Sequence, residues 1–304
     1  MKKCILIITS SIDVTVDYII RQYNHIASFY RLNVDQFANY AFNIGIDTGW
    51  TISCSQWNIR ESDVYSIYYR KPLLPDLTEY EDFYRSMISR DIISLINGIV
   101  DDFSGKVLTK PSLLRKTENK TFQLLYARRH NIAMPESYIG NHNPFDNIEG
   151  LMIIKPLTTG KITVAERTEI YQTSYINKAL GDISLTPIYV QHYTEKAYEV
   201  RLTYIDGIIF AVRIDSPDKL DWRKNYAKLT YSLIECPVFI KNMCCALMRD
   251  WNLHFGAFDF IVLPTDEWIF LEVNPNGQWL WIEHELKIPI SNYIIETSFQ
   301  IAYR

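Results

Sequence analysis

The sequence predicts an α/β protein that becomes α+β in its C-terminal half, and three observations support this fold class. The chain opens with a buried-strand pattern followed by an amphipathic helical pattern, CILIITSSIDVTVDYIIRQYN. It closes with apolar runs in pairs, which are typical of antiparallel hairpins. Its 304 residues are enough to bury a large core, and this length suggests two or three structural units.

The composition is that of an ordinary globular protein and limits the classes of partner. The net charge is −4, so no nucleic-acid or membrane partner is expected. The 5 cysteines are odd in number and lack metal-ligand spacing, so neither a disulfide framework nor a zinc site is indicated. A reducing, cytoplasmic location fits this cysteine usage, and no apolar run approaches the length of a membrane span.

The first unit, residues 1–105, is expected to be a small α/β domain around a parallel sheet. After the opening strand and helix, strand patterns recur in SFYRL, WTISC and VYSIYYRKP. A long helical pattern then runs from about Glu79 to Val100.

The second unit, residues 106–190, contains a helix in TENKTFQLLYARRHN, with Thr117 as its expected N-cap. A strand follows MPES, and LMIIKPLTTGKITV predicts two strands around a glycine-containing turn. Lys155 ends the apolar run LMII and precedes Pro156. A lysine at such a buried position needs an anion, and phosphate is a natural one, although a structural lysine that reaches to solvent is the alternative.

The third unit, residues 191–304, follows the strand PIYVQHY and contains a helix at about Val238 to Asp250. Its hairpin EVRLTYIDGIIFAVRID should close at the Asp-Gly turn, which pairs Arg213 with Val200, on the face opposite Arg201. Arginines on apolar strands suggest recognition of phosphate or carboxylate, and surface ion pairs are the alternative for each one.

The segment FDFIVLPTDEWIFLEVNPNGQW predicts a second hairpin, in which two apolar runs both end in acid. Symmetric closure of its loop pairs Leu263 with Trp268, Ile261 with Phe270, and Asp259 with Glu272. Like charges opposite each other repel, so a protonated acid, a nearby arginine or a divalent cation must offset the cost. The cation is the economical solution, because Asn274 on the same face adds a carbonyl oxygen; two solvated acids at an exposed strand end are the alternative.

At these residues the sequence resembles the ATP-grasp ligases. NKTFQLLYARRHNIAMPESYI resembles the helix that enters the central domain, IIKP the second lysine position, and VQHY the adenine-binding hinge. EVRL resembles the motif written D-I-R-V in the ribosomal-protein glutamyl ligases, and FDF with FLEVNPNGQW resembles the magnesium-binding end. YYRKP, DWR and FLEVNPNGQW further resemble the graspetide (microviridin-type) peptide macrocyclases of RiPP biosynthesis.

This resemblance implies a fold, an activity and a set of site residues. The fold would be ATP-grasp, with an N-terminal pre-ATP-grasp domain and two sheet-containing domains that enclose ATP. The enzyme would be a ligase that uses ATP and Mg²⁺ to activate Asp or Glu side chains of a ribosomal precursor peptide as acyl phosphates. A Ser or Thr hydroxyl or a Lys amine of the same peptide would then close an ω-ester or ω-amide macrocycle.

The implied residues group by role. The nucleotide would be contacted by Lys120, Lys155, Gln191, His192, Tyr193 and Glu199. The metal would be held by Asp259, Glu272 and Asn274. The catalytic arginines would be Arg201, Arg213 and Arg223, and the acidic core of the precursor would meet Arg70 and Lys71. Two departures from the family pattern are the short TTGK lid and Glu199, which stands where the family often has Asp.

Two other readings stay open at this point: a ligase that joins an amino acid or amine to a protein or small carboxylate, and a catalytically silent module that binds a leader peptide. Ligases of the family are often dimeric, so a homodimer is a further expectation.

Overall fold

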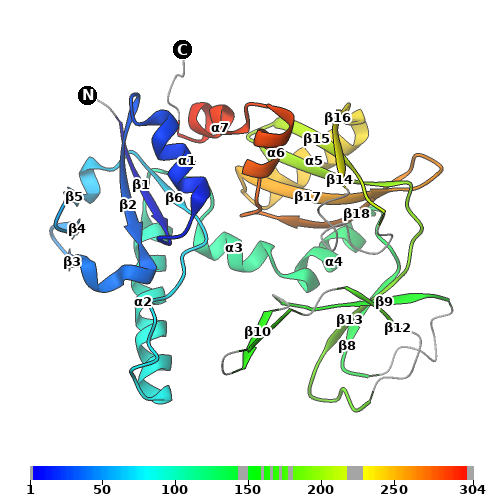
Figure 1. Cartoon of the computed structure of the whole chain (residues 1–304), viewed down its shortest axis with the longest axis horizontal. Helices are drawn as coiled ribbons and strands as arrows, with labels where there is room; N and C mark the ends of the chain where they lie inside the picture. The colour runs from blue at the N-terminus through cyan, green and yellow to red at the C-terminus, as the bar shows by residue number, and fades with distance from the viewer. Residues whose placement is uncertain are drawn as a thin grey trace.

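The computed structural model describes residues 3–142, 150–158, 161–164, 167–170, 173–176, 181–217 and 229–299. Figure 1 shows the N-terminal sheet on one side, the large C-terminal sheet on the other, and a smaller central sheet below the latter. The helices α3 (Pro111–Thr117) and α4 (Lys120–Arg129) lie between them.

The N-terminal sheet is parallel throughout, as the sequence predicts, with the order β2-β1-β6-β7. Its strands are β1 (Lys3–Thr9), β2 (Ala27–Asn33), β6 (Ser66–Tyr69) and β7 (Lys106–Val107). Its helices are α1 (Val14–Tyr23) and α2 (Asp82–Asp102), with 3₁₀ turns at Val34–Asn39 and Glu61–Asp63. The WTISC strand lies elsewhere, in an antiparallel sheet of β3 (Ala41–Gly45), β4 (Gly49–Ser53) and β5 (Asn58–Arg60).

In the second unit, two sequence predictions need correction. Thr117 is the last residue of α3 and its hydroxyl donates to the Leu113 carbonyl, so Asn119 caps α4 instead, accepting from the Phe122 N–H at 3.0 Å. The two strands around the TTGK turn both exist, but they do not pair with each other. β9 (Met152–Lys155) pairs with β12 (Ser174–Ile176) and β13 (Ile188–His192), whereas β10 (Lys161–Val164) pairs with β11 (Arg167–Ile170). β8 (Ser137–Gly140) completes the central sheet on the other side of β13.

The C-terminal sheet is antiparallel, with the order β16-β15-β14-β17-β18. The strands are β14 (Tyr198–Ile205), β15 (Ile208–Asp215), β16 (Thr230–Ile234), β17 (Phe255–Val262) and β18 (Trp268–Asn274). The turn between β14 and β15 is the predicted Asp-Gly turn, and both residues have positive φ, 44° and 94°. The helix α5 (Val238–Asp250) has the predicted limits and packs on one face of this sheet through Cys244, Leu247 and Met248.

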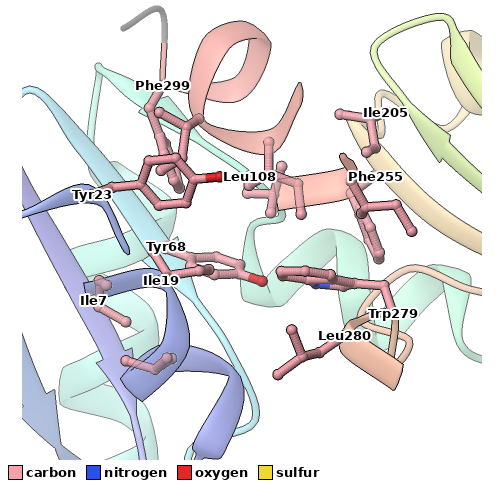
Figure 2. Packing of buried hydrophobic residues seen from close by; sticks show 14 of the residues in the cluster. Ile7, Ile19, Tyr23, Tyr68, Leu108, Ile205, Phe255, Trp279, Leu280 and Phe299 are labelled. Carbon is pink, nitrogen blue, oxygen red and sulfur yellow. The ribbon is translucent and has the colours of Figure 1, made fainter. Parts of the chain in front are cut away.

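A hydrophobic cluster joins the N-terminal and C-terminal sheets (Figure 2). Tyr68 from β6 and Trp279 from the segment after β18 are both essentially buried in it. They are joined by side chains of α6 (Leu280–Leu286), α7 (Ile290–Tyr293) and the π-helical turn at Ile294–Ser298. Burying a large apolar side chain stabilises a fold by roughly 1.5–3 kcal/mol, so this cluster fixes the NPNGQW segment against the N-terminal unit.

The limits at residues 105 and 190 stay a prediction, although β7 joins the first sheet and β13 runs through 190 within the central sheet. Among the described residues, no helix combines the length and apolar character needed to cross a membrane.

Candidate active site

Three charged residues lie in a row across the C-terminal sheet. Arg201 of β14 is directly opposite Asp259 of β17, and Asp259 is directly opposite Glu272 of β18. Residues opposite each other in neighbouring strands project to the same face, so the three side chains share one face of the sheet. The predicted pairing of the two acids is therefore confirmed.

The rest of the predicted register is wrong, because a β-bulge follows the acid pair. Beyond the shift between Asp259 and Phe260, Phe260 pairs with Phe270 and Val262 pairs with Trp268. The symmetric register expected Ile261 opposite Phe270. The bulge leaves the acids aligned and moves only the part of the hairpin nearest its loop.

The repulsion between the acids is offset by a neighbouring arginine. Nη1 of Arg201 lies 2.8 Å and 2.9 Å from the two carboxylate oxygens of Asp259. Both side chains are buried, and the row as a whole carries one net negative charge. The sequence argument favoured a cation for this task; the structure shows that the arginine alternative performs it, so a metal ion here must be supported by other observations.

The NPNG segment packs tightly against this row. The side-chain oxygen of Asn274 accepts the backbone N–H of Asn276 at 3.0 Å. A Cβ on Gly277 would lie 2.5 Å from the Ala257 Cβ and 3.0 Å from Nη2 of Arg201. Only glycine fits at this position without displacing its neighbours, which explains the residue type that follows Asn-Pro-Asn.

The two lysines predicted to contact the nucleotide come together. Lys120 begins α4, and its ammonium donates to the carbonyl of Pro156, the residue that follows Lys155 at the end of β9. Lys155 pairs with Tyr189 of β13 within the central sheet. This hydrogen bond brings the start of α4 to the end of β9, although the two lie far apart in the sequence.

Many of the polar groups of the predicted hinge, Gln191 to Tyr193, already form hydrogen bonds within the protein. The backbone N–H groups of His192 and Tyr193 donate to Glu136 and Leu151 at 2.8 Å and 2.7 Å. Gln191 is fully buried, and its amide nitrogen donates to Ser137 and to the Tyr189 hydroxyl. The nucleotide contacts of these three residues therefore stay a prediction.

The sequence reasoning missed the segment that follows. The backbone N–H groups of residues 194–196, between β13 and β14, have no acceptor among the described residues. Within this segment, Lys196 pairs with the carboxylate of Glu199. The adenine contacts predicted for Gln191, His192 and Tyr193 are not thereby changed; the N–H groups of residues 194–196 extend the same stretch of chain.

Glu272 lies close enough to the central sheet to influence it. Burial raises the pKa of Tyr189 on β13 to about 12, and the charge of Glu272 acts in the same direction, whereas a hydrogen bond with Ser137 opposes it. Glu272 of the C-terminal sheet is thus a near neighbour of Tyr189 in the central sheet.

Of the predicted catalytic arginines that the structure describes, Arg201 lies in the acid row and Arg213 does not. Arg213 pairs with Val200, as expected, and so lies on the face opposite Arg201. There it binds Asp215 through two nitrogens, at 2.8 Å and 2.7 Å, and stacks 4.1 Å from the centre of the Tyr198 ring. Arg223 and the DWR motif lie outside the described residues.

The predicted substrate residues lie at the junction of the sheets. Arg70 is fully buried; its Nε lies 3.1 Å from the Asp13 carboxylate, and its Nη2 donates to the side-chain oxygen of Gln278. Lys71 follows it and is half-buried. The contacts of Arg70 tie the N-terminal unit to NPNGQW, so contact of either residue with substrate stays a prediction.

The residues present fit a magnesium ion, although the described residues contain no group of three or more His, Cys, Asp and Glu side chains placed to hold a metal. A hard cation prefers oxygen donors, and Asp259, Glu272 and Asn274 offer carboxylate and amide oxygens from adjacent strands. Asn274 spends one lone pair on Asn276 and keeps another.

No protein-family model matches the chain, and no curated protein matches it either. Solved structures do match over almost the whole chain. The macrocyclase MdnB from Microcystis aeruginosa MRC is 25% identical, with a TM-score of 0.80 over 97% of this chain and 98% of its own. MdnC from the same organism, bound with precursor peptide MdnA, is 23% identical, with a TM-score of 0.85 over 98% and 99% of the two chains.

A RiPP-associated ATP-grasp ligase from Chryseobacterium gregarium, in complex with ADP and a leader and core peptide, is 23% identical, with a TM-score of 0.86 over 99% and 98% of the two chains. The ATP-grasp ligase PsnB has been solved with a minimal precursor, Mg and ADP, and matches at 19% identity, with a TM-score of 0.74 over 97% and 96% of the chains. The chain thus has the ATP-grasp fold, and the resemblance to RiPP ATP-grasp ligases that its motifs predict is confirmed.

Proposed function

We propose that this chain is an ATP-dependent ligase that closes macrocycles in a ribosomally made precursor peptide. It activates an Asp or Glu side chain of the peptide as an acyl phosphate, and a Ser or Thr hydroxyl or a Lys amine of the same peptide displaces the phosphate. The product is an ω-ester or an ω-amide ring.

The row of Arg201, Asp259 and Glu272, with Asn274 beside it, is the observation that supports this proposal most strongly. The row is built on an ATP-grasp fold whose solved neighbours include ligases crystallised with precursor peptides, ADP and Mg. The chemistry requires this combination, since an anionic carboxylate must approach an anionic triphosphate.

The cations of the chain lower that electrostatic barrier. Lys120 and Lys155 lie together at the end of β9 and would neutralise the phosphates of ATP. Arg201 is preorganised by Asp259 and by the loop around Gly277, so it would stabilise charge on the transferred phosphoryl group without reorganising. Mg²⁺ held by Asp259, Glu272 and Asn274 would neutralise the developing charge of the phosphates when bound. The backbone N–H groups of residues 194–196, which have no acceptor among the described residues, would hold the adenine together with Gln191, His192 and Tyr193.

The test incubates the protein with ATP, Mg²⁺ and a short precursor peptide rich in Thr, Glu and Lys, of the kind that a gene beside its own would encode. The measurements are ADP release and the mass of the peptide. Macrocyclisation predicts release of ADP that depends on the peptide, and a product lighter by one water for each ring.

The other two readings predict different results. A ligase that joins two molecules adds the mass of the second substrate to the first. A silent leader-binding module binds the peptide and releases no ADP. Either result would overturn the proposal. Dimerisation of the chain stays a prediction that the elution volume of the protein in size-exclusion chromatography would test.

A further inference from the structure

Lys71 is half-buried, and the charges of Asp13 and Glu118 act on it only at a distance. Within the described part of the chain its ammonium has neither a hydrogen bond nor an ion pair. Its two cationic neighbours differ in this respect, because Arg70 is paired with Asp13 and Arg201 with Asp259. Removing a charge from water without a partner is costly, so a lysine kept in this state suggests a use for the amine itself.

The backbone of Lys71 is also unusual. Its φ is 42°, in the left-handed region, and the next residue is Pro72. A residue before proline normally adopts an extended conformation, and left-handed non-glycine residues cost of order 1–3 kcal/mol where the surroundings enforce them. The enforcing contacts belong to Arg70, which is buried and fixed by Asp13, Thr15 and Gln278.

These contacts place Lys71 beside the acid row. Arg70 donates to the side-chain oxygen of Gln278, and Nη2 of Arg201 lies 3.4 Å from the backbone oxygen of the same residue. Arg201 in turn holds Asp259. The backbone of Lys71 therefore adjoins this junction, and the charge of Arg201 acts on the Lys71 ammonium, which places that ammonium near the row where the proposed acyl phosphate would form.

The charges that act on Lys71 come from each element around it. Burial lowers its pKa to about 8; Arg70 and Arg201 act in the same direction, whereas Asp13 and Glu118 oppose them. Glu118, at the end of α3, is itself partly buried. Burial raises the pKa of its carboxyl, and the charge of Lys71 lowers it. Near pH 8 a substantial fraction of Lys71 is thus neutral.

We propose that Lys71 is the proton acceptor in the second half of the reaction: its neutral amine removes the proton of the peptide's nucleophile as that group attacks the acyl phosphate. The inference rests on the proposed function and deepens it. For a hydroxyl, the oxygen forms a bond to the acyl carbon, its proton passes to Nζ of Lys71, and the bond between carbon and phosphate oxygen breaks with its electron pair on the phosphate. The lysine then returns its proton to solvent.

A lysine suits this task where an arginine does not. An arginine stays protonated at any working pH, and Arg70 and Arg201 already supply permanent positive charge at the site. If Lys71 served only to hold the substrate carboxylate as a permanent cation, we would expect it to be more exposed to solvent and to have an acidic partner in the protein. General base catalysis of this kind contributes about 10²–10⁴-fold to a rate.

The decisive variant is Lys71→Arg, which keeps the charge and removes the basic amine. Two readouts with the same precursor peptide separate the half-reactions. Hydroxylamine traps the acyl phosphate as a hydroxamate, and mass spectrometry counts rings. We expect the variant to form hydroxamate at close to the wild-type rate and to lose cyclisation by about 10²-fold or more. Lys287→Arg is the matched control, because Lys287 is exposed and also has a left-handed backbone, with φ 57°; it should behave as wild type.

A second measurement needs no peptide. Reductive methylation with ¹³C-formaldehyde followed by NMR titration reports the pKa of each lysine in the whole protein, and Lys71→Arg identifies the signal of Lys71. We expect a value near 8 in the wild type. In Glu118→Gln it should fall further, because Glu118 favours the protonated form. The rising limb of cyclisation against pH should move to lower pH in the same variant.

The outcomes are distinct. Wild-type cyclisation by Lys71→Arg, or an ordinary lysine pKa at residue 71, would overturn the role of Lys71 and leave the proposed function intact. Loss of hydroxamate formation together with cyclisation in Lys71→Arg would show a role in binding or folding and would also overturn it. Absence of ADP release in the wild type would refute the proposed function itself.

Discussion

Gly277→Ala tests the close packing that positions Arg201. The added Cβ would lie 2.5 Å from the Ala257 Cβ, 3.0 Å from Nη2 of Arg201 and 3.3 Å from the Asn274 carbonyl. Carbon atoms in contact are ordinarily about 3.5–4.0 Å apart, so the segment must move by roughly 1 Å. The Ala257 Cβ is attached directly to a central strand and cannot swing aside. Overpacking of this kind costs about 1–3 kcal/mol.

The same shift would displace the Arg201 guanidinium and the backbone of Asn274, the proposed metal ligand at the end of β18. A misplacement of about 1 Å in a catalytic group costs on the order of 10²-fold in rate. We therefore expect Gly277→Ala to lower the thermal midpoint by roughly 2–6 °C and ADP release with peptide by about 10²-fold. Both are measured on the purified variant, by thermal unfolding and by a coupled ADP assay.

Gly98→Ala is the control for this substitution. Gly98 is exposed within α2, and nothing lies within 4 Å of the position that its Cβ would occupy. Alanine in a helix interior is more stable than glycine by about 0.5–1 kcal/mol, so this variant should be slightly stabilised and fully active. If Gly277→Ala matched it in both assays, the tight packing of NPNG on Arg201 would be refuted.

Three further predictions follow from other contacts. Glu272→Gln should abolish ADP release with peptide while thermal unfolding is unchanged, because the amide keeps the shape and loses the charge; undiminished activity would remove the metal assignment. Arg70→Met should destabilise the protein by about 3 kcal/mol in chemical unfolding, because the largely buried Asp13 carboxylate loses its cationic partner and keeps only its hydrogen bonds; a neutral effect would contradict the interpretation of Arg70 as a tie between the two sheets. Burial raises the pKa of Asp206, but hydrogen bonds with His254 and Lys106 outweigh it and hold the pKa below the unfolded value of 3.8. The stability from Asp206 is thus present above pH 3.8 and lost as the pH falls below it, so the thermal midpoint of Asp206→Asn should depend less on pH in that range; equal slopes would contradict this.

The acid hairpin shows how far sequence reasoning reaches. Alternation and loop symmetry predict that Asp259 faces Glu272, and they do. The bulge beside them cannot be predicted, because the residues on both sides are apolar and either register buries them. The pairing of Asp259 with Arg201 could not be predicted for another reason. Arg201 is 58 positions away, and only the order of the strands in the sheet places the two residues opposite each other.

Helix limits also divide into those that the sequence marks and those that only the folded chain decides. The helix expected at about Val238 to Asp250 has those limits in the structure, and Pro237 directly precedes it. Thr117 and Asn119 are both good capping residues two positions apart, and packing of α3 decides between them. The Lys71 amine carries no signal in sequence beyond its place before Pro72, since its left-handed backbone and its charged neighbours arise only in the folded chain.

The central claim is that Asp259, Glu272 and Asn274 hold a divalent metal ion beside the nucleotide. A crystal of the protein grown with ADP and Mn²⁺ tests this claim most directly. Mn²⁺ substitutes for Mg²⁺ at oxygen sites and is located by its anomalous scattering. The account predicts an anomalous peak bound by the carboxylates of Asp259 and Glu272 and the side-chain oxygen of Asn274, next to the nucleotide phosphates. Nucleotide bound in the crystal with Mn²⁺ held elsewhere, or with Glu272 turned away to solvent, would contradict it.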